Sequence, residues 1–359
     1  MAETSSRLAF VDALKAVALQ LIVLHHLAFY GPMSDQAYVL APGLFSWLSE
    51  YARSAVQAFL VIGGFLAARS LAPAGVLLAA QPLALLRKRY LKLITPYLAA
   101  VLIAIACAAI ARVLMSHDSI PGRPTLAQVL AHALLLQGVL DYEGLSAGVW
   151  YVAIDFQLFA LLLGALWLAR GLGRQRRVAL LGALLVGGLA AASLYHFNRD
   201  SAWDVWALYF FGSYALGVLT YWATHQRSAA GWLLLIAAVV VAALLVDFRS
   251  RIAVALLVAL ALGLASRGGF LESWPRSRAI AYLATISYSV FLIHFPVCLV
   301  ISGLFWRFAG DDPRVNLLGV LVAWLASLLA GALFYRLVEN PAQHGLRRLQ
   351  PGARVMQRA

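Results

Sequence analysis

The sequence predicts an all-α polytopic membrane protein, a bundle of about ten transmembrane helices with both termini in the cytoplasm. Of its 359 residues, 63% are hydrophobic and only 12% are charged, a composition typical of membrane proteins. A helix needs about 20 apolar residues to cross the hydrocarbon core of a bilayer, and apolar runs of that kind recur along the chain with short polar breaks. What remains leaves no room for a long soluble domain.

The apolar segments that could span a membrane follow one another along the whole chain. They lie near residues 8–30, 54–71, 95–114, 149–169, 178–196, 205–224, 231–246, 252–266, 280–303 and 315–337. The first lacks the basic start and the small-residue cleavage site of a secretory signal, so we expect it to be retained as a helix. The segment 126–140 is apolar but short, and it could be interfacial, re-entrant or spanning.

The distribution of basic residues favours one of these topologies. Lys and Arg in short loops accumulate on the cytoplasmic side of a membrane, and with ten spans most of the 28 Lys and Arg lie there. If 126–140 also crossed, the basic run "RGLGRQRR" at 170–177 would face outward. We therefore predict that 126–140 does not span, that residues 1–340 form a transmembrane domain, and that 341–359 form a basic cytoplasmic tail. Orientation, not nucleic-acid binding, then explains the net charge of +13.

The first predicted span, with "DALKAVALQLIVLHHL" at residues 12–27, contains unusually costly residues. A charged side chain at the centre of a span costs about 2.5–3.5 kcal/mol, so such groups are candidates for function. On a helix, Lys15 and His26 are about 16 Å apart along the axis and about 20° apart around it, with Asp12 about 40° to the other side. Lys15 could instead simply extend to the interface and pair with Asp12, but this leaves His26 unexplained. His25 lies about 100° off this face, which indicates a structural role.

Three polar residues from different spans are predicted to lie at a similar depth. Counted from the outer ends of their spans, His26, Asp155 and His294 fall within one or two helical turns of each other at about 1.5 Å per residue. A carboxylate beside a histidine orients the ring and raises its basicity, as a general base requires. Each residue alone could be a satisfied core residue, but the three together predict a catalytic group.

Basic residues near the cytoplasmic ends of the spans form a second predicted set. The run 87–92 opens the third span, where it could serve only as an orientation signal. It could also bind an anionic group such as the phosphates of a nucleotide cofactor. The candidate contacts are Asp12, Lys15, Arg69, Arg87, Arg89 and Lys92.

Six short motifs occur in one order along the predicted spans. They are Arg7 with "DALK" and His26, then "FLVIGGFLAARSL", "LLRKRYLKLITPYL", "WYVAIDFQLF", "SYSVFLIHFP" and the closing "ENP". Together they resemble the acyltransferase-3 family of integral membrane acyltransferases, which modify bacterial surface carbohydrates and some small molecules. The match runs through nearly the whole chain.

The resemblance implies transfer of an acyl group, commonly acetyl, from cytoplasmic acyl-CoA to an acceptor hydroxyl, here on a carbohydrate or lipid-linked glycan. It implies a multi-pass protein of the bacterial inner membrane, with membrane lipids as its surroundings and with neither a metal nor a nucleic-acid partner. His26 corresponds to the family's catalytic histidine. Lys15 and Lys92 stand where the family has Arg, Asp155 where it has Glu, and Gly63 where it usually has Ser.

From this resemblance we expect His26 to deprotonate the acceptor hydroxyl or to relay its proton, and Asp155 to orient the His26 imidazole. We expect Lys15 and the run 87–92 to hold the CoA phosphates. Direct transfer and a covalent acyl-enzyme both stay open, although no Ser or Cys has the signature of a nucleophile, which favours direct transfer. A transporter or flippase with an intramembrane His/Asp proton relay is the main alternative. A catalytically silent envelope partner is a third.

Overall fold

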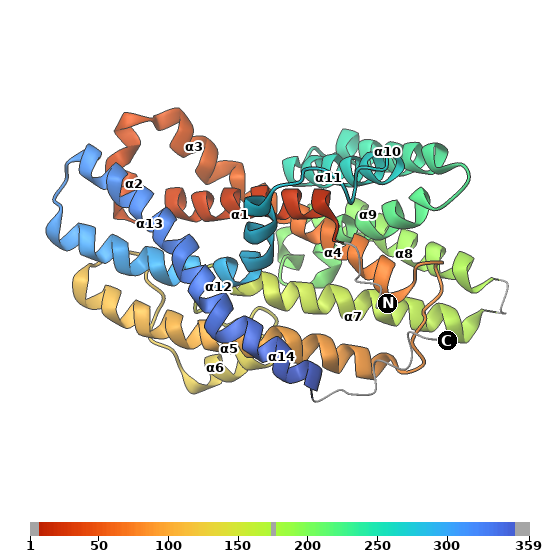
Figure 1. Ribbon diagram of the computed structural model, residues 1–359, viewed down its shortest axis with the longest axis horizontal. Coiled ribbons are helices and arrows are strands. Elements are labelled where there is room, and N and C mark those ends of the chain that lie inside the picture. The colour runs from red at the N-terminus through yellow and green to blue at the C-terminus, as the bar shows by residue number, and fades with distance from the viewer. Residues whose placement is uncertain (1–6, 174–176, 349–359) are drawn as a thin grey trace. The chain divides into compact units, whose positions relative to one another are not determined.

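The computed structural model describes residues 7–173 and 177–348, and every element in these ranges is helical (Figure 1). The chain divides into two compact units. Unit 1 comprises Met1–Ile22, Tyr51–Leu86 and Ala153–Thr285, and unit 2 comprises Val23–Glu50, Arg87–Val152 and Ile286–Ala359. The helices that contribute residues to both units are α1 (Ala9–Phe29), α5 (Pro82–Leu114), α7 (Val149–Leu172) and α12 (Arg278–Phe308).

Nine helical segments of the described residues are long and apolar enough to cross a membrane. They are Ala9–Phe29, Ala52–Leu71, Pro82–Leu114, Val149–Leu172, Val178–Arg199, Ala229–Val246, Ser250–Arg267, Arg278–Phe308 and Pro313–Leu346. Each overlaps one predicted span. The chain is therefore a multi-pass membrane protein built as a bundle of helices, as predicted.

The predicted span 205–224 corresponds to α9 (Ala207–Thr224), which is not among these nine. Most of its side chains are buried, because α9 packs against α4 (Val56–Leu71), α8 (Val178–Tyr195), α10 (Ala229–Val246) and α11 (Ser250–Arg267). Small and polar residues are favoured where membrane helices face one another, and they lower the hydropathy of α9. Its assignment as a tenth span stays a prediction.

Two glycines let α4 and α9 approach closely within unit 1 (Figure 1). A Cβ atom added to Gly64 would lie 1.9 Å from the carbonyl oxygen of Tyr214, and one added to Gly217 would lie 1.9 Å from that of Val61. No side chain fits at such distances. The two backbones are therefore in contact through glycine, as in other membrane helix pairs with small residues at the interface.

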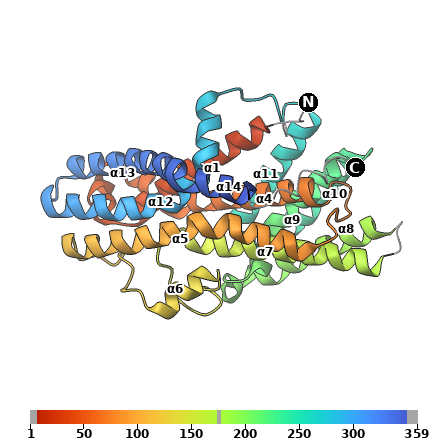
Figure 2. The same ribbon diagram turned by 60° about the horizontal axis from the view of Figure 1, so that its bottom comes forward.

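In unit 2, α12 and α13 (Pro313–Phe334) form an antiparallel hairpin (Figure 2). Asp312 caps α13 by accepting hydrogen bonds from the backbone of the first turn. A Cβ atom on Gly331 would lie 2.3 Å from Val290 Cγ2, so glycine again permits close packing. After α13 the chain continues as a π-helix, η5 (Tyr335–Glu339), and then as α14 (Asn340–Arg348).

The remaining helices of unit 2 are short. They are α2 (Pro32–Ala37), η1 (Tyr38–Leu40), α3 (Pro42–Glu50) and α6 (Leu126–Ala133). The short helices of unit 1 are η2 (Ala52–Ala55), η3 (Phe197–Arg199) and η4 (Ser201–Trp203). With 8 residues, α6 rises about 12 Å, which is shorter than the hydrocarbon core of a bilayer. That the whole segment 126–140 does not span stays a prediction.

Parts of two predicted segments lie outside the described residues. The predicted tail 341–359 begins inside α14, and residues 349–359 are not described; neither are residues 174–176 of the basic run 170–177. The division into a domain over 1–340 and a tail therefore stays a prediction.

Candidate active site

The two histidines predicted to share a level, His26 and His294, are in direct contact within unit 2. His26 lies in the last turn of α1 and His294 on α12. The side chains are buried, with exposed fractions of 8% and 0%. Nδ1 of His26 lies 2.5 Å from Nε2 of His294, and the ring planes are within 5° of parallel. The structure thus brings these two predicted site residues together, while their catalytic roles stay a prediction.

A backbone contact fixes the direction of this hydrogen bond. Nδ1 of His294 lies 3.1 Å from the carbonyl oxygen of Val290, which can only accept, so Nδ1 carries the proton. A neutral imidazole has one N–H group, and Nε2 of His294 must then accept. His26 therefore donates its Nδ1–H to His294, and Nε2 of His26 keeps its lone pair. This is the tautomer that a general base needs.

Aromatic side chains surround the histidine pair. The ring of Tyr30 lies 5.5 Å from that of His26, centroid to centroid, and packs edge-on against Phe295. Phe291 lies 6.1 Å from His294 by the same measure. Such a shell excludes water, and hydrogen bonds are stronger in a medium of low dielectric constant.

The neighbouring His25 makes a different contact. Its Nδ1 donates a hydrogen bond of 3.0 Å to the carbonyl oxygen of Leu48 on α3, and its side chain is buried. This contact ties α1 to α3 within unit 2, which agrees with the predicted structural role.

Asp155, the predicted partner of His26, lies on α7 in unit 1 and is buried, with 7% exposed. A Cβ atom added to Gly63 of α4 would lie 3.8 Å from Asp155 Oδ1 and 3.2 Å from the ring of Tyr214. The Tyr214 ring therefore lies beside Asp155, in space that the side chain of a serine at position 63 would need. The predicted role of Asp155 towards His26 stays a prediction.

At the start of α1, Asp12 forms an ion pair with Arg7. Arg7 also donates hydrogen bonds to the carbonyl oxygen of Ala281 and, at 3.0 Å, to Thr285 Oγ1. Arg7 and Asp12 thus attach the start of α1 to the start of α12 within unit 1. Lys15 follows on the same helix and is half-buried. The roles of Asp12 and Lys15 in donor binding stay predictions.

The other predicted basic residues belong to the two units separately. Arg69, in the last turn of α4, is half-buried in unit 1 and interacts electrostatically with Tyr221. Arg87, Arg89 and Lys92 lie in unit 2 at the start of α5. Arg87 and Lys92 are exposed and Arg89 is half-buried, and their roles in donor binding stay predictions.

Glu339 is a buried carboxylate that the sequence reasoning did not include among the candidate site residues. It ends the π-helix η5 and is buried, with 5% exposed. Its carboxylate accepts hydrogen bonds from Ser289 Oγ at 2.5 Å and Gln343 Nε2 at 2.8 Å, and it interacts electrostatically with Lys92. The closing "ENP" motif contained this residue, and a π-helix often marks a functional position.

The described residues contain no group of three or more His, Cys, Asp or Glu side chains that could hold a metal ion. The cysteines Cys107 and Cys298 are free. Cys298 is buried and lies 4.0 Å from Ser327 Oγ.

Comparison with known proteins identifies the type of enzyme. The model of the acyltransferase 3 family, described as an acyltransferase domain, matches residues 8–336. Neither a search of curated proteins nor a search of solved structures found a match. The matched range covers most of the chain and includes the histidine pair, Asp155 and all the predicted basic site residues. The chain belongs to the acyltransferase 3 family and is a membrane acyltransferase.

Proposed function

We propose that this enzyme moves an acyl group, most simply acetyl, from cytoplasmic acyl-CoA to a hydroxyl of a carbohydrate or other cell-envelope acceptor, in the bacterial cytoplasmic membrane. The observation that carries the proposal is the chain of hydrogen bonds from His26 through His294 to the carbonyl oxygen of Val290. It presents His26 Nε2 as a base in a buried site, where a hydroxyl can be deprotonated as it attacks.

In the proposed reaction, the acceptor oxygen attacks the thioester carbonyl carbon while its proton passes to His26 Nε2. The C–S bond then breaks, an ester forms, and the thiolate of CoA leaves and receives the proton. The positive charge on His26 in the transition state is stabilised by the lone pair of His294 Nε2, which accepts the Nδ1–H bond. Base catalysis of this kind contributes about 10²–10⁴-fold in rate. Asp155 is proposed to assist in orienting His26.

The anionic end of the donor is proposed to bind basic residues at the cytoplasmic ends of the helices. Lys92, Arg87 and Arg89 lie at the start of α5, and Lys15 and Arg69 are the proposed basic contributors from unit 1. The acidic Asp12 is proposed to belong to the same donor entrance, next to Lys15. Lysine keeps the charge of the family's arginine but lacks its planar fork, so its contact with phosphate is less directional.

The test uses the purified full chain in lipid nanodiscs with radiolabelled acetyl-CoA and a panel of carbohydrate acceptors. Both labelled ester and released CoA are measured, for wild type and for His26→Ala. We expect His26→Ala to lose nearly all acceptor-dependent transfer. Equal transfer by the two proteins would show that His26 is not the base.

His25→Gln is the matched control, because Gln can still donate a hydrogen bond to the Leu48 carbonyl oxygen. We expect it to keep the wild-type rate. If wild type itself transfers nothing to any acceptor from any acyl-CoA tested, acyl transfer by this chain is contradicted and the transporter reading becomes the stronger one.

A further inference from the structure

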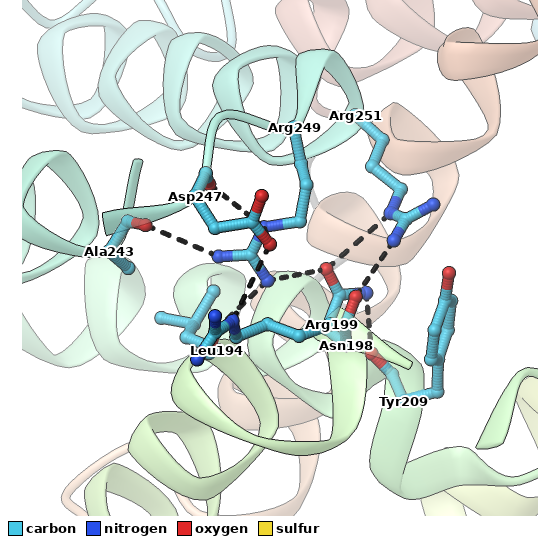
Figure 3. Close-up of polar contacts among 8 residues, drawn as sticks. All are labelled: Leu194, Asn198, Arg199, Tyr209, Ala243, Asp247, Arg249 and Arg251. Carbon is cyan, nitrogen blue, oxygen red and sulfur yellow. Dashed lines mark hydrogen bonds and ion pairs between the residues drawn. The ribbon is translucent and has the colours of Figure 1, made fainter. Parts of the chain in front are cut away.

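Three arginines gather at one end of unit 1, where the connections α8–α9 and α10–α11 meet (Figure 3). They are Arg199 from η3, Arg249 just before α11, and Arg251 in the first turn of α11. Figure 3 shows them around Asn198 and beside Tyr209, which lies in the first turn of α9. We call these residues, with Asp247, the arginine cluster. All of these residues belong to unit 1, whereas the histidine pair belongs to unit 2.

Arg249 has a structural role in the arginine cluster. It is 8% exposed, and its Nη1 donates to the carbonyl oxygen of Leu194 at 2.9 Å and to Asn198 Oδ1 at 3.0 Å. Its Nε donates to the carbonyl oxygen of Asp247 at 3.2 Å, and Nη2 donates to that of Ala243 at 3.4 Å. All three nitrogens are used. Arg249 therefore joins the ends of α8 and α10 to the start of α11. Its hydrogen bonds also compensate for the burial of its charge.

Arg251 is arranged differently, because its bonds lie along one edge of the guanidinium. Its Nη2 donates to the carbonyl oxygen of Asn198 at 2.8 Å and its Nε to Asn198 Oδ1 at 3.4 Å. Its Cζ atom lies 4.8 Å above the ring of Tyr209, a cation–π contact. In Figure 3 the remaining nitrogen points away from Asn198. The side chain is only half-buried, so this nitrogen can reach a further acceptor.

Positive charge exceeds negative charge on the side of the Tyr209 phenol. Arg53 of η2, Arg249 and Arg251 all interact electrostatically with Tyr209, against one acidic side chain, Asp204. Two more carboxylates belong to the same two connections, and both interact with other groups of the protein. Asp247 Oδ2 lies 3.6 Å from Arg199 Nε and 3.5 Å from Arg249 Nε, and Asp200 Oδ1 accepts from the backbone N–H of Ala202.

The surface next to the arginine cluster is strongly apolar. Leu245 is 83% exposed at the end of α10, and Phe248 is 72% exposed in the connection to α11. Trp206, directly before α9, is also exposed, and aromatic residues of this kind are enriched at membrane–water interfaces. Since α10 and α11 are both candidate spans, their shared end marks the depth at which lipid headgroups lie.

We propose that Arg251, together with the exposed Arg53, binds the phosphate of an anionic membrane lipid. The guanidinium is permanently charged, and the Arg251 nitrogen that does not bond to Asn198 can donate a charge-assisted hydrogen bond to a phosphate oxygen. Arg251 is held in place by Asn198 and Tyr209, so the open part of its fork is pre-positioned. Leu245 and Phe248 supply the apolar surface against which the acyl chains of the same lipid lie. The proposed lipid site shares no residue with the histidine pair or with the proposed donor-binding residues.

The test is photo-crosslinking of the purified full chain in nanodiscs. The probe is phosphatidylglycerol with a photoreactive group on its headgroup, and the comparison probe is a diacylglycerol with the same group and no phosphate. Crosslinked peptides are mapped by mass spectrometry. We expect the phosphatidylglycerol probe to label peptides covering 197–209 and 245–252 at least fivefold more than the comparison probe, and Arg251→Gln to reduce that labelling about tenfold.

Arg267→Gln is the matched control, because Arg267 lies at the other end of α11; it should leave labelling at 197–209 and 245–252 unchanged. Arg251→Lys keeps the charge without the fork and should give intermediate labelling. If Arg251→Gln lowers the melting temperature of the protein, Arg251→Lys becomes the variant that tests the proposal. Equal labelling of wild type and both Arg251 variants would overturn the proposal. So would loss of labelling in millimolar inorganic phosphate, which would identify a site for free phosphate.

Discussion

Ser289 donates a 2.5 Å hydrogen bond from its hydroxyl to the carboxylate of Glu339, and so links the "SYSVFLIHFP" segment of α12 to the closing "ENP" segment. Ser289 is five positions before His294, which corresponds to about 7.5 Å along α12. The same carboxylate interacts electrostatically with Lys92 of α5. Both motifs therefore meet at the buried carboxylate of Glu339 in unit 2, and the exposed Lys92 interacts with the same carboxylate.

The first prediction is that Glu339 positions Lys92 for the donor. Glu339→Gln keeps the shape and an acceptor for Ser289 but removes the negative charge next to Lys92. We expect the KM for acyl-CoA to change by fivefold or more while kcat changes less than twofold, because Glu339 would act through Lys92 on the donor only. Steady-state kinetics with varied acyl-CoA measure both values. Ser289→Ala keeps the charge and should change the KM less; a fall in kcat alone would contradict the prediction.

The second prediction concerns the acceptor that His294 offers to His26. His294→Phe keeps a flat ring but removes the lone pair that receives the His26 Nδ1–H bond. We expect kcat to fall about 10²–10⁴-fold, the usual range for losing base catalysis. His294→Gln, whose side-chain oxygen can accept that bond, should recover at least tenfold over His294→Phe. Equal rates for the two variants would mean that the ring, and not its lone pair, is what matters.

Parts of this site could be predicted from sequence, and the reasons are physical. A histidine or aspartate inside an apolar run is costly, so His26, Asp155 and His294 could be selected from the sequence. The rise per residue of a helix then predicted that the two histidines lie at a similar depth, and the structure brings these two together. Which nitrogen bonds which partner could not be predicted, because it depends on the carbonyl of Val290 and on side-chain rotation. The role of Glu339 was missed because its partners come from α12 and from α5, far away in sequence.

The fold, like the site, could be predicted from the sequence only in part. Hydropathy predicted each of the nine candidate spans, since apolar length alone decides whether a helix can cross a membrane. It could not predict that α9 would be enclosed by α4, α8, α10 and α11, because packing partners are not encoded in local hydropathy. The arginine cluster could not be predicted either, since it assembles from two connections and from the starts of α9 and α11.

The third prediction compares two adjacent glycines of α4. Gly64→Ala would place a methyl group 1.9 Å from the backbone oxygen of Tyr214, whereas in Gly63→Ala the nearest atom is 3.2 Å away on the Tyr214 ring. A backbone oxygen cannot move aside as a ring can, and overpacking typically costs 1–3 kcal/mol or more. Thermal unfolding in detergent should therefore show a much larger loss of melting temperature for Gly64→Ala. Equal losses would contradict the close approach of α4 and α9.

The fourth prediction is a local effect of pH at His132, in the non-spanning helix α6. His132 Nδ1 donates to the carbonyl oxygen of Gln128 at 2.8 Å, and its Nε2 accepts from the backbone N–H of Leu145 at 3.2 Å. This arrangement needs the neutral ring, and burial lowers the pKa of His132 below its ordinary value of 6.5. The folded state thus binds a proton less readily than the unfolded state. The stabilisation is fully present above pH 6.5 and is lost as pH falls through the lowered pKa.

Hydrogen–deuterium exchange of the segment around Leu145, corrected for the intrinsic effect of pH, measures this loss. We expect protection in wild type to fall about tenfold or more between pH 7.5 and pH 5, because protonation removes the acceptor of the Leu145 N–H and strands a buried donor, which costs about 1–3 kcal/mol. His132→Gln places an oxygen acceptor near the Nε2 position and does not titrate in this range. Its protection should stay flat with pH, and a parallel fall in both proteins would assign the effect to another group.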